Sequence, residues 1–565
     1  MLSFAVFEGD APATQWPVRL AQLFGAQDLP LQGAVRFEDS KLVCDKTSPE
    51  TAGLLIQFPV GAPSLSPNGA VRPASDEHGI GLLALKTCLL PDREQPYLLS
   101  LELARHRIMQ FLNKLEDWGL FDLPADDPIL QEFELARRSF TAALVAQKHS
   151  DGPGGDAWTF SPQADKMARA SLAQALDAGE KLAIANAERA MPLRLAGQFY
   201  QRAAAQYTAI TQDKPPAGVP IVVPGSSCAV VPGTPLIGCT ISPDQFSEPL
   251  QKAATSACDF VTMPMRWIDM EPAEGRYDTT STDRWIEWAV RTAKLPVVGG
   301  PLIDLRASCI PEWLYIWEND YETLRELVYD HVQHLVTRYR RTVSRWTVCS
   351  GLHVNSNFKL SFEQIMDLTR VCILVVKKLH PAAKIQLEIA QPWGEYHAEN
   401  KRSIPPLMYA EAVVQSGQQV DALGLRIQMG QPASGQATRD LMALSDMLDH
   451  YGSLERPIAV TAMGVPSMNS APAQGRDSGM WRAPWSDTLQ AEWLTKAMMI
   501  CLSKPYVHSV CWQELADAAA KPEMPGGGLV SATGAPKPAA TRMIALRKAL
   551  HGTQPFPQFG GEARP

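Results

Sequence analysis

The sequence predicts an α/β protein in which a C-terminal (β/α)8 TIM barrel follows a β-rich, sandwich-like domain and a helical hairpin. Three observations favour the barrel. Short apolar runs alternate with helical patterns from about residue 235 onward. Eight such units in roughly 310 residues suit a TIM barrel. No glycine-rich phosphate loop follows any run, which disfavours the competing doubly wound open sheet. The runs are LIGCTI, DFVTMPM, LPVVGGPLID, SRWTVCS, KIQLEIA, DALGLRIQ, PIAVTAMG and VHSVCWQE.

Residues 1–98 predict the β-rich domain. Four apolar runs in this region are bounded by Gly, Pro, Asp and Ser, as short strands usually are. They cover residues 34–39, 41–45, 53–60 and 80–90. We expect them to form a small sandwich.

Residues 99–212 predict the helical hairpin. Apolar residues recur at helical spacing over 99–120 and 129–147. A long helix is expected from Ser161-Pro162, an N-cap followed by a first-turn proline, to about residue 190. A loop is expected at residues 149–157, and a linker at the proline- and glycine-rich residues 213–234. The barrel is expected to cover residues 235–550, followed by a flexible tail over residues 551–565.

Composition limits the class of protein. The 565 residues are 45% hydrophobic and 20% charged, which permits a large core, and the formal charge of −8 argues against nucleic acid as a partner. No apolar stretch reaches the ~18 residues of a membrane span, and the first residues lack the pattern of a signal peptide. The ten cysteines have no metal-ligand spacing. We therefore expect a cytoplasmic protein with no metal, no cofactor and no membrane partner.

A series of motifs runs through the predicted barrel. MRW (265–267) and EPAEGRY (271–277) follow the second predicted strand, and IPEW (310–313) follows the third. WTV (346–348), GLRIQ (424–428), IAVT (458–461) and Trp512 fall on later strands, and GLV (528–530) and GAPKPA (534–539) close the region. In this order and spacing the motifs resemble those of the family-10 glycoside hydrolases, the β-1,4-xylanases.

The departures from that resemblance concern the catalytic positions. Retaining glycoside hydrolysis uses two carboxylates ~5–5.5 Å apart, one as acid/base and one as nucleophile. The resemblance places the acid/base after the fourth strand, where this sequence has Gly351, and the nucleophile on the seventh, where it has Ala462. Neither side chain can donate a proton or attack an anomeric carbon. We therefore expect the usual chemistry to be absent.

The resemblance also implies a sugar-binding cleft. Its candidate residues here are Arg266, Trp267, Arg306, Gln428 and Trp512. If both arginines point into the cleft, they would favour an anionic ligand such as a uronate or phosphate. The further tryptophans that could line a cleft, or equally pack in the core, are Trp393, Trp481 and Trp485.

Other polar residues near predicted strand ends leave alternatives open. Asp304, Glu388 and Glu514 are either solvated or ion-paired loop residues, or they include a relocated catalytic pair, Glu388 with Glu514. His353 is a candidate lone base and Cys349 a candidate nucleophile, although a structural role is favoured for both. The polar loop 467–485 is expected to cover the barrel mouth as a lid or an assembly contact.

Two functions follow from these observations. The first is a glycoside-hydrolase-like pseudoenzyme that binds a glycan or small sugar, or acts in assembly, without the standard chemistry. The second is an active endo-β-1,4-xylanase-like hydrolase with a relocated carboxylate pair. The β-rich domain is a candidate carbohydrate-binding module by analogy with such enzymes. The helical hairpin is a candidate contact for a homo-oligomer.

Overall fold

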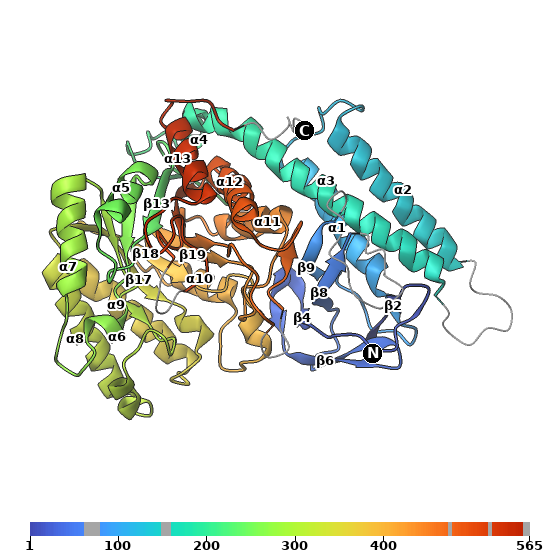
Figure 1. Cartoon of the computed structure of the whole chain (residues 1–565), viewed down its shortest axis with the longest axis horizontal. Helices are drawn as coiled ribbons and strands as arrows, with labels where there is room; N and C mark the ends of the chain where they lie inside the picture. The colour runs from blue at the N-terminus through green and yellow to red at the C-terminus, as the bar shows by residue number, and fades with distance from the viewer. Residues whose placement is uncertain (62–78, 149–159, 473–476, 518–522, 558–565) are drawn as a thin grey trace.

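The structure is a computed structural model, and it describes residues 1–61, 79–148, 160–472, 477–517 and 523–557. The loop predicted at 149–157 and most of the predicted C-terminal tail lie outside these ranges. Figure 1 shows the barrel at one end of the molecule and the N-terminal sheets at the other, with long helices running along one side of both.

The C-terminal part is a closed parallel barrel, as predicted. Each strand pairs in parallel with the next, and β15 pairs with β17 to continue the sheet past the short β16 (Ile303–Asp304). All eight predicted strands are present. They are β13 (Leu236–Thr240), β14 (Phe260–Met263), β15 (Val297–Gly299), β17 (Val343–Ser350), β18 (Lys384–Ile389), β19 (Ala422–Gln428), β20 (Ile458–Gly464) and β22 (Val507–Trp512).

Helices surround the barrel, and local sequence explains where they begin. In α9 (Phe362–Leu379), the Ser361 hydroxyl accepts a hydrogen bond from the Gln364 N–H while the Gln364 side chain accepts one from the Ser361 N–H, which is a capping box. The other helices are α5 (Glu248–Ala257), α6 (Trp267–Met270), α7 (Thr280–Glu287), α8 (Tyr321–Tyr339), α10 (Pro406–Gln415), α11 (Leu441–Gly452), α12 (Asp487–Ser503) and α13 (Pro538–Leu550).

Two sheets in the N-terminal region share one hydrophobic core. Leu2 and Leu42 from the first sheet and Ile56 and Leu83 from the second belong to the same buried cluster. The first sheet contains β10 (Tyr97–Leu98), β1 (Leu2–Ala5), β7 (Lys41–Lys46) and β6 (Gly33–Glu38). The second contains β9 (Gly81–Lys86), β8 (Gly53–Val60), β4 (Gln22–Phe24), β5 (Pro30–Leu31) and one strand contributed by the barrel. A small separate pair is β2 (Phe7–Glu8) with β3 (Ala11–Pro12).

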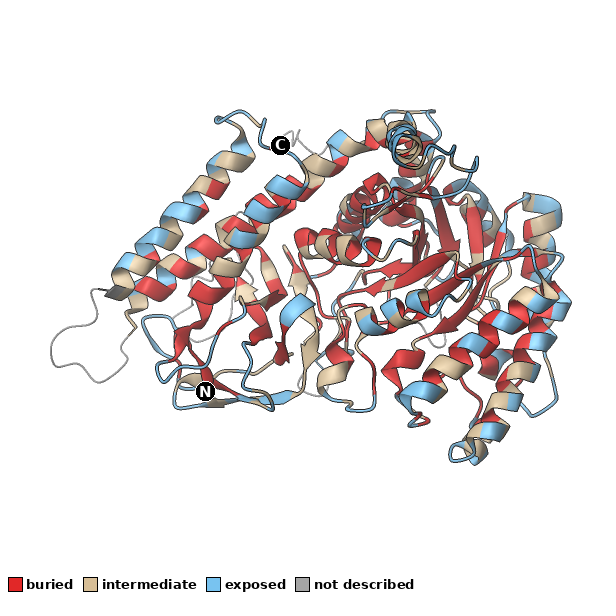
Figure 2. Ribbon diagram, turned by 180° about the vertical axis from the view of Figure 1, so that it is seen from behind, coloured by how far each residue is buried: buried red, intermediate tan, exposed pale blue. Residues whose placement is uncertain are grey.

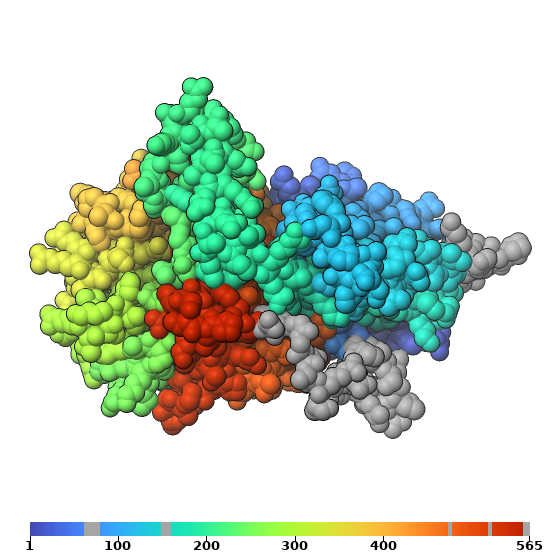
Figure 3. Space-filling model, turned by 90° about the horizontal axis from the view of Figure 1, so that it is seen from above, coloured from blue at the N-terminus to red at the C-terminus, as the bar shows by residue number. Residues whose placement is uncertain are grey.

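The helical region is larger than a hairpin. It contains α1 (Leu99–Asp117), α2 (Pro128–Lys148), α3 (Pro162–Leu195) and α4 (Gln198–Thr211), followed by the short strands β11 (Ile221–Val222) and β12 (Ala229–Val230). Helix α3 packs against α1 and α2 and continues past them to contact α11 and α12 of the barrel. Figure 2 shows buried residues along the length of α3, where it packs against the neighbouring helices, the sheets and the barrel. Seen from above, the green segment that contains α4 projects from the body (Figure 3). Within the described ranges, no helix has the length and hydropathy needed to cross a membrane.

The loop after β20 joins the barrel to the N-terminal sheet. Its strand β21 (Met480–Trp481) pairs antiparallel with β9, and the Gln57 side-chain amide donates a 3.1 Å hydrogen bond to the Asp477 carbonyl. The sequence predicts that this loop covers the barrel mouth as a lid or an assembly contact. The described residues of the loop that form β21 are held at the N-terminal sheet.

Close backbone approach at β21 requires a glycine on its partner. Gly81 has φ +120°, and a Cβ built there would lie 2.1 Å from the Met480 carbonyl oxygen. We expect Gly81→Ala to lower the free energy of unfolding by about 2–3 kcal/mol, because it adds steric overlap to an unfavourable φ. Gly218 (φ +74°) has no neighbouring atom within 4 Å, so Gly218→Ala should cost only about 1 kcal/mol. Urea unfolding of both variants checks this, and equal losses would contradict it.

A polar junction holds the helices to the barrel. On α3, buried Glu180 accepts hydrogen bonds from the Leu441 N–H (3.0 Å) and the Trp481 indole (2.7 Å) and pairs with Arg482. On α1, Lys114 pairs with Asp446 (2.8 Å) and Asp449 (2.9 Å) of α11. We call these contacts the junction.

Candidate functional site

A cavity of about 400 Å³ opens at the carboxyl ends of the barrel strands. Its wall includes Thr240, Thr262 and Thr347 on the strands, and Gln513 and Glu514 directly after β22. TIM-barrel sites lie at this end of the strands because the strand-to-helix loops converge there. The closed barrel therefore brings together side chains that lie far apart in the sequence.

Two arginines and three carboxylates form an ion-pair network in this cavity. Arg306 pairs with Asp304 (2.7 Å) and Glu523 (3.3 Å), and Arg426 pairs with Glu388 (2.9 Å) and with Glu523 (3.4 Å). Burial opposes ionisation of Asp304, but the charge of Arg306 outweighs it and the pKa of Asp304 lies below its usual value. Each arginine therefore already faces carboxylates.

Glu514 differs from the other carboxyl groups of the cavity. Burial raises its pKa to about 7, and the nearby Glu523 charge acts in the same direction. Its Oε1 accepts a 2.8 Å hydrogen bond from the Glu523 N–H, while its Oε2 has no partner among the described residues. A carboxyl group with this pKa can hold a proton near neutral pH and donate it.

Ala462 and Gly351, which stand where the resemblance implies the two catalytic carboxylates, lie in different surroundings. The methyl group of Ala462 lines the cavity. Gly351 follows the end of β17 with φ +62°, and a Cβ there would meet Ala390 at 3.3 Å, outside the residues that line the cavity. The neighbouring Ser350 hydroxyl donates a 2.6 Å hydrogen bond to Glu388. A side chain restored at Ala462 would therefore enter the cavity, whereas one at Gly351 would strain the backbone.

Only some of the predicted sugar-binding residues line the cavity. Arg266 lies at its rim, paired with Asp269 (2.5 Å), and Arg306 lies inside it. Trp267 and Trp512 are fully buried, and their indoles donate to Glu271 and to the Gly527 carbonyl. Gln428 is buried beside Gln436, to which its side chain is hydrogen-bonded at 2.9 Å. Trp481 and Trp485 are also buried, and Trp393 borders a second pocket.

The candidate base His353 and the candidate nucleophile Cys349 are buried outside the cavity. The His353 ring makes a 2.9 Å hydrogen bond to the Ala390 carbonyl, and burial lowers its pKa to about 4. Burial raises the pKa of the Cys349 thiol well above its ordinary value. Neither group is among the residues that line the cavity.

The two carboxyl groups of the predicted relocated pair lie in one cavity, together with two charged residues that the sequence did not predict. Glu388 and Glu514 both line it, as do the unpredicted Arg426 and Glu523. Arg426 could have been found, because it alternates with buried Leu425 and Ile427 along β19 and so faces the barrel interior. Glu523 lies in a loop with no periodic signal.

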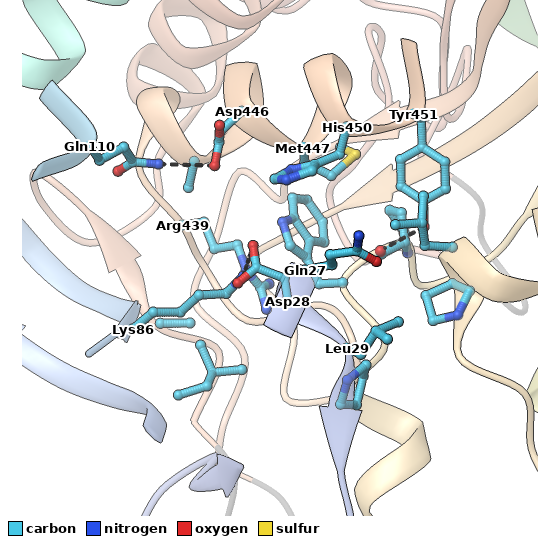
Figure 4. Close-up of a pocket in the computed structure, with 18 of the residues that line it drawn as sticks. Gln27, Asp28, Leu29, Lys86, Gln110, Arg439, Asp446, Met447, His450 and Tyr451 are labelled. Atoms are coloured by element: carbon cyan, nitrogen blue, oxygen red, sulfur yellow. Dashed lines mark hydrogen bonds and ion pairs between the residues drawn. The ribbon is translucent and has the colours of Figure 1, made fainter. Parts of the chain in front are cut away.

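A second pocket lies where the N-terminal sheets, α1 and α11 meet (Figure 4). In the part of the chain that the structure describes, one group of side chains could share a metal ion: Asp28, Asp446 and His450, whose ligand atoms lie within 4.8 Å of one another. Lys86 pairs with Asp28 at 2.9 Å and Lys114 with Asp446 at 2.8 Å. These lysines already balance both carboxylates, so the geometry does not require a metal.

Comparisons with known proteins identify one sequence family and several similar solved structures. The sequence model of glycosyl hydrolase family 10 matches residues 229–544. Among solved structures, native xylanase 10B from Thermotoga maritima is 18% identical, with 56% of this chain and 97% of that chain covered and a TM-score of 0.44. Xylanase 10B from Thermotoga petrophila RKU-1 in complex with xylobiose is 17% identical (56% and 94% covered, TM-score 0.43). A family-10 protein from Paenibacillus barcinonensis is 16% identical (59% and 97% covered, TM-score 0.42). Because the family model matches more than half of its residues, the chain belongs to glycosyl hydrolase family 10.

Proposed function

We propose that the barrel binds a saccharide in its strand-end cavity but does not hydrolyse it by the retaining mechanism. The observation that carries this proposal is the lining of the cavity. Ala462 presents a methyl group where the family resemblance implies the nucleophile, and Asp304, Glu388 and Glu523 are all ion-paired with arginines.

The chemistry of the lining supports binding better than retaining hydrolysis. A retaining enzyme needs an ionised nucleophile that is free to attack and a protonated partner ~5–5.5 Å away. Glu514 has the pKa of a proton donor. The carboxylates held by Arg306 and Arg426 must give up charge-assisted hydrogen bonds before they can attack, which opposes nucleophilic catalysis. Hydroxyl-rich ligands can still bond to the polar wall.

Restoring a carboxylate at Ala462 tests the proposal. We expect the wild-type protein to bind xylotetraose without releasing product, and Ala462→Glu to cleave it at least ~100-fold faster than wild type, because a nucleophile then enters the cavity that contains Glu514. Ala462→Gln is the matched control, since it has the same size without the charge. Product formation is followed by chromatography and binding by calorimetry.

Hydrolysis of xylotetraose by the wild-type protein would overturn the proposal. That outcome would favour a second function, a working hydrolase with Glu514 as acid and Glu388 as nucleophile or base. The observation that favours it is the presence of both carboxyl groups in one cavity with unlike surroundings, which is how acid and base are distinguished in glycosidases. Activity would then disappear in Glu514→Gln and in Glu388→Gln.

A further inference from the structure

The cavity contains buried hydrogen-bond acceptors that are not satisfied by the described residues. They are Oε2 of Glu514 and Oε1 of Gln513, in residues 6% and 4% exposed. Carboxylate and amide oxygens act as acceptors, so a group that donates hydrogen bonds would satisfy them. Each buried acceptor left unpaired costs about 1–3 kcal/mol. The wall therefore favours a ligand rich in donors.

The charge of the wall points in the same direction. Among the described residues that line the cavity, the cations are Arg266, Arg306 and Arg426. They are outnumbered by the carboxyl groups Asp244, Asp269, Asp278, Asp304, Glu388, Glu514 and Glu523. Acid remains in excess even when Glu514 is protonated. The sequence expectation that the arginines would favour a uronate or phosphate is therefore not supported, because the carboxylates balance them.

We propose that this cavity selects saccharides that carry free amino groups, such as oligomers of glucosamine, over their N-acetylated and neutral counterparts. The inference rests on the proposed saccharide-binding function of the same cavity. An ammonium group donates three hydrogen bonds and carries a positive charge, so it suits a wall with an unpaired carboxyl oxygen and an unpaired amide oxygen. Acetylation removes the charge, and a hydroxyl group lacks it.

Glu514 links this selectivity to pH. Burial, Glu523 and Asp517 raise its pKa to about 7, while Arg306 and Arg426 form ion pairs with Glu523. An ammonium ligand favours ionised Glu514 and must displace its proton below pH 7, so its affinity falls as the pH falls. We expect the affinity for the amino saccharide to fall up to tenfold per pH unit between pH 6.5 and 5.5, with no matching fall for the N-acetylated saccharide.

The test compares three tetrasaccharides on the full-length protein by calorimetry at low ionic strength. They are the β-1,4-linked tetramer of glucosamine, the same tetramer fully N-acetylated, and xylotetraose. At pH 7 we expect the amino tetramer to bind at least ~10-fold more tightly than the other two. Glu514→Gln should reduce this ratio to less than about threefold, because it removes the ionisable acceptor.

Two further variants keep the test decisive. Glu492→Gln, on the exposed face of α12 and paired with Lys496, is the matched control and should leave the ratio unchanged. Asp244→Asn, at an exposed rim position, should lower the ratio about twofold without disturbing the core, so it replaces Glu514→Gln if that variant fails to fold. Equal affinity for the amino and acetylated tetramers would overturn the inference. If xylotetraose still bound in that case, the proposed saccharide-binding function would remain supported. Binding of none of the three would overturn both.

Discussion

Replacing Glu180 with alanine is expected to lower the free energy of unfolding by about 3–5 kcal/mol. The carboxylate is 1% exposed and joins α3 to the barrel through the Leu441 N–H, the Trp481 indole and Arg482. Its removal leaves two buried donors unpaired and leaves Arg482 paired with Asp177 alone among the described carboxylates.

Urea unfolding monitored by tryptophan fluorescence measures this effect. Arg189→Ala serves as the control on the same helix, because Arg189 makes an exposed ion pair with Asp122 and should hardly affect stability. A loss below 1 kcal/mol for Glu180→Ala would show that the junction does not hold the two parts together.

The second large effect is expected for Lys114→Met. Lys114 is 6% exposed and pairs with Asp446 and Asp449, so its loss leaves uncompensated negative charge on two half-buried side chains of α11. We expect a destabilisation of about 3–5 kcal/mol at pH 7. Asp449 keeps its bonds to Lys504 and Tyr506, which places most of the effect on Asp446.

The pH dependence of the stability of Lys114→Met shows whether the destabilisation comes from the lost ion pair. Burial opposes ionisation of Asp446, but the charge of Lys114 outweighs it and lowers the pKa in the wild-type protein. The pair therefore stabilises the wild-type fold above pH ~3.8 and is lost as the pH falls through the lowered pKa. Without Lys114, burial raises the pKa of Asp446. Protonation of Asp446 at lower pH then removes its uncompensated charge and restores part of the lost stability. The difference between variant and wild type should shrink from pH 7 to pH 4; a constant difference would instead indicate lost packing.

The barrel could be predicted from the sequence because its signals are local. Each strand is an apolar run, and α9 begins at a capping box that four residues define. The strand β21 could not be predicted in this way. It has two residues inside a polar loop, and it forms because Met480 meets Leu82 of a distant part of the chain. Helix α4 lies inside the predicted helical region 99–212, but no periodic pattern identified it as a separate helix.

The candidate site was predictable to the extent that barrel geometry fixes it. Glu388 and Glu514 were expected near strand ends, and the structure brings both to one cavity. The tryptophans were harder to place, since an indole suits a sugar platform and a packed core equally well. Trp267 and Trp512 lie in the core. The charge of the cavity depends on Glu523, whose loop carries no sequence pattern.

The pairing of β21 with β9 can form only after most of the chain has been synthesised. Gln57 and Asp477, which also bond across this contact, are 420 residues apart. At about 5–20 residues per second, the ribosome releases β21 tens of seconds after β9. During that interval Gly81 and Leu82 at the edge of β9 lack the strand that pairs with them, and exposed edges promote aggregation. We therefore expect the N-terminal sheet to need a chaperone, or an early non-native partner, until the seventh unit of the barrel has left the ribosome.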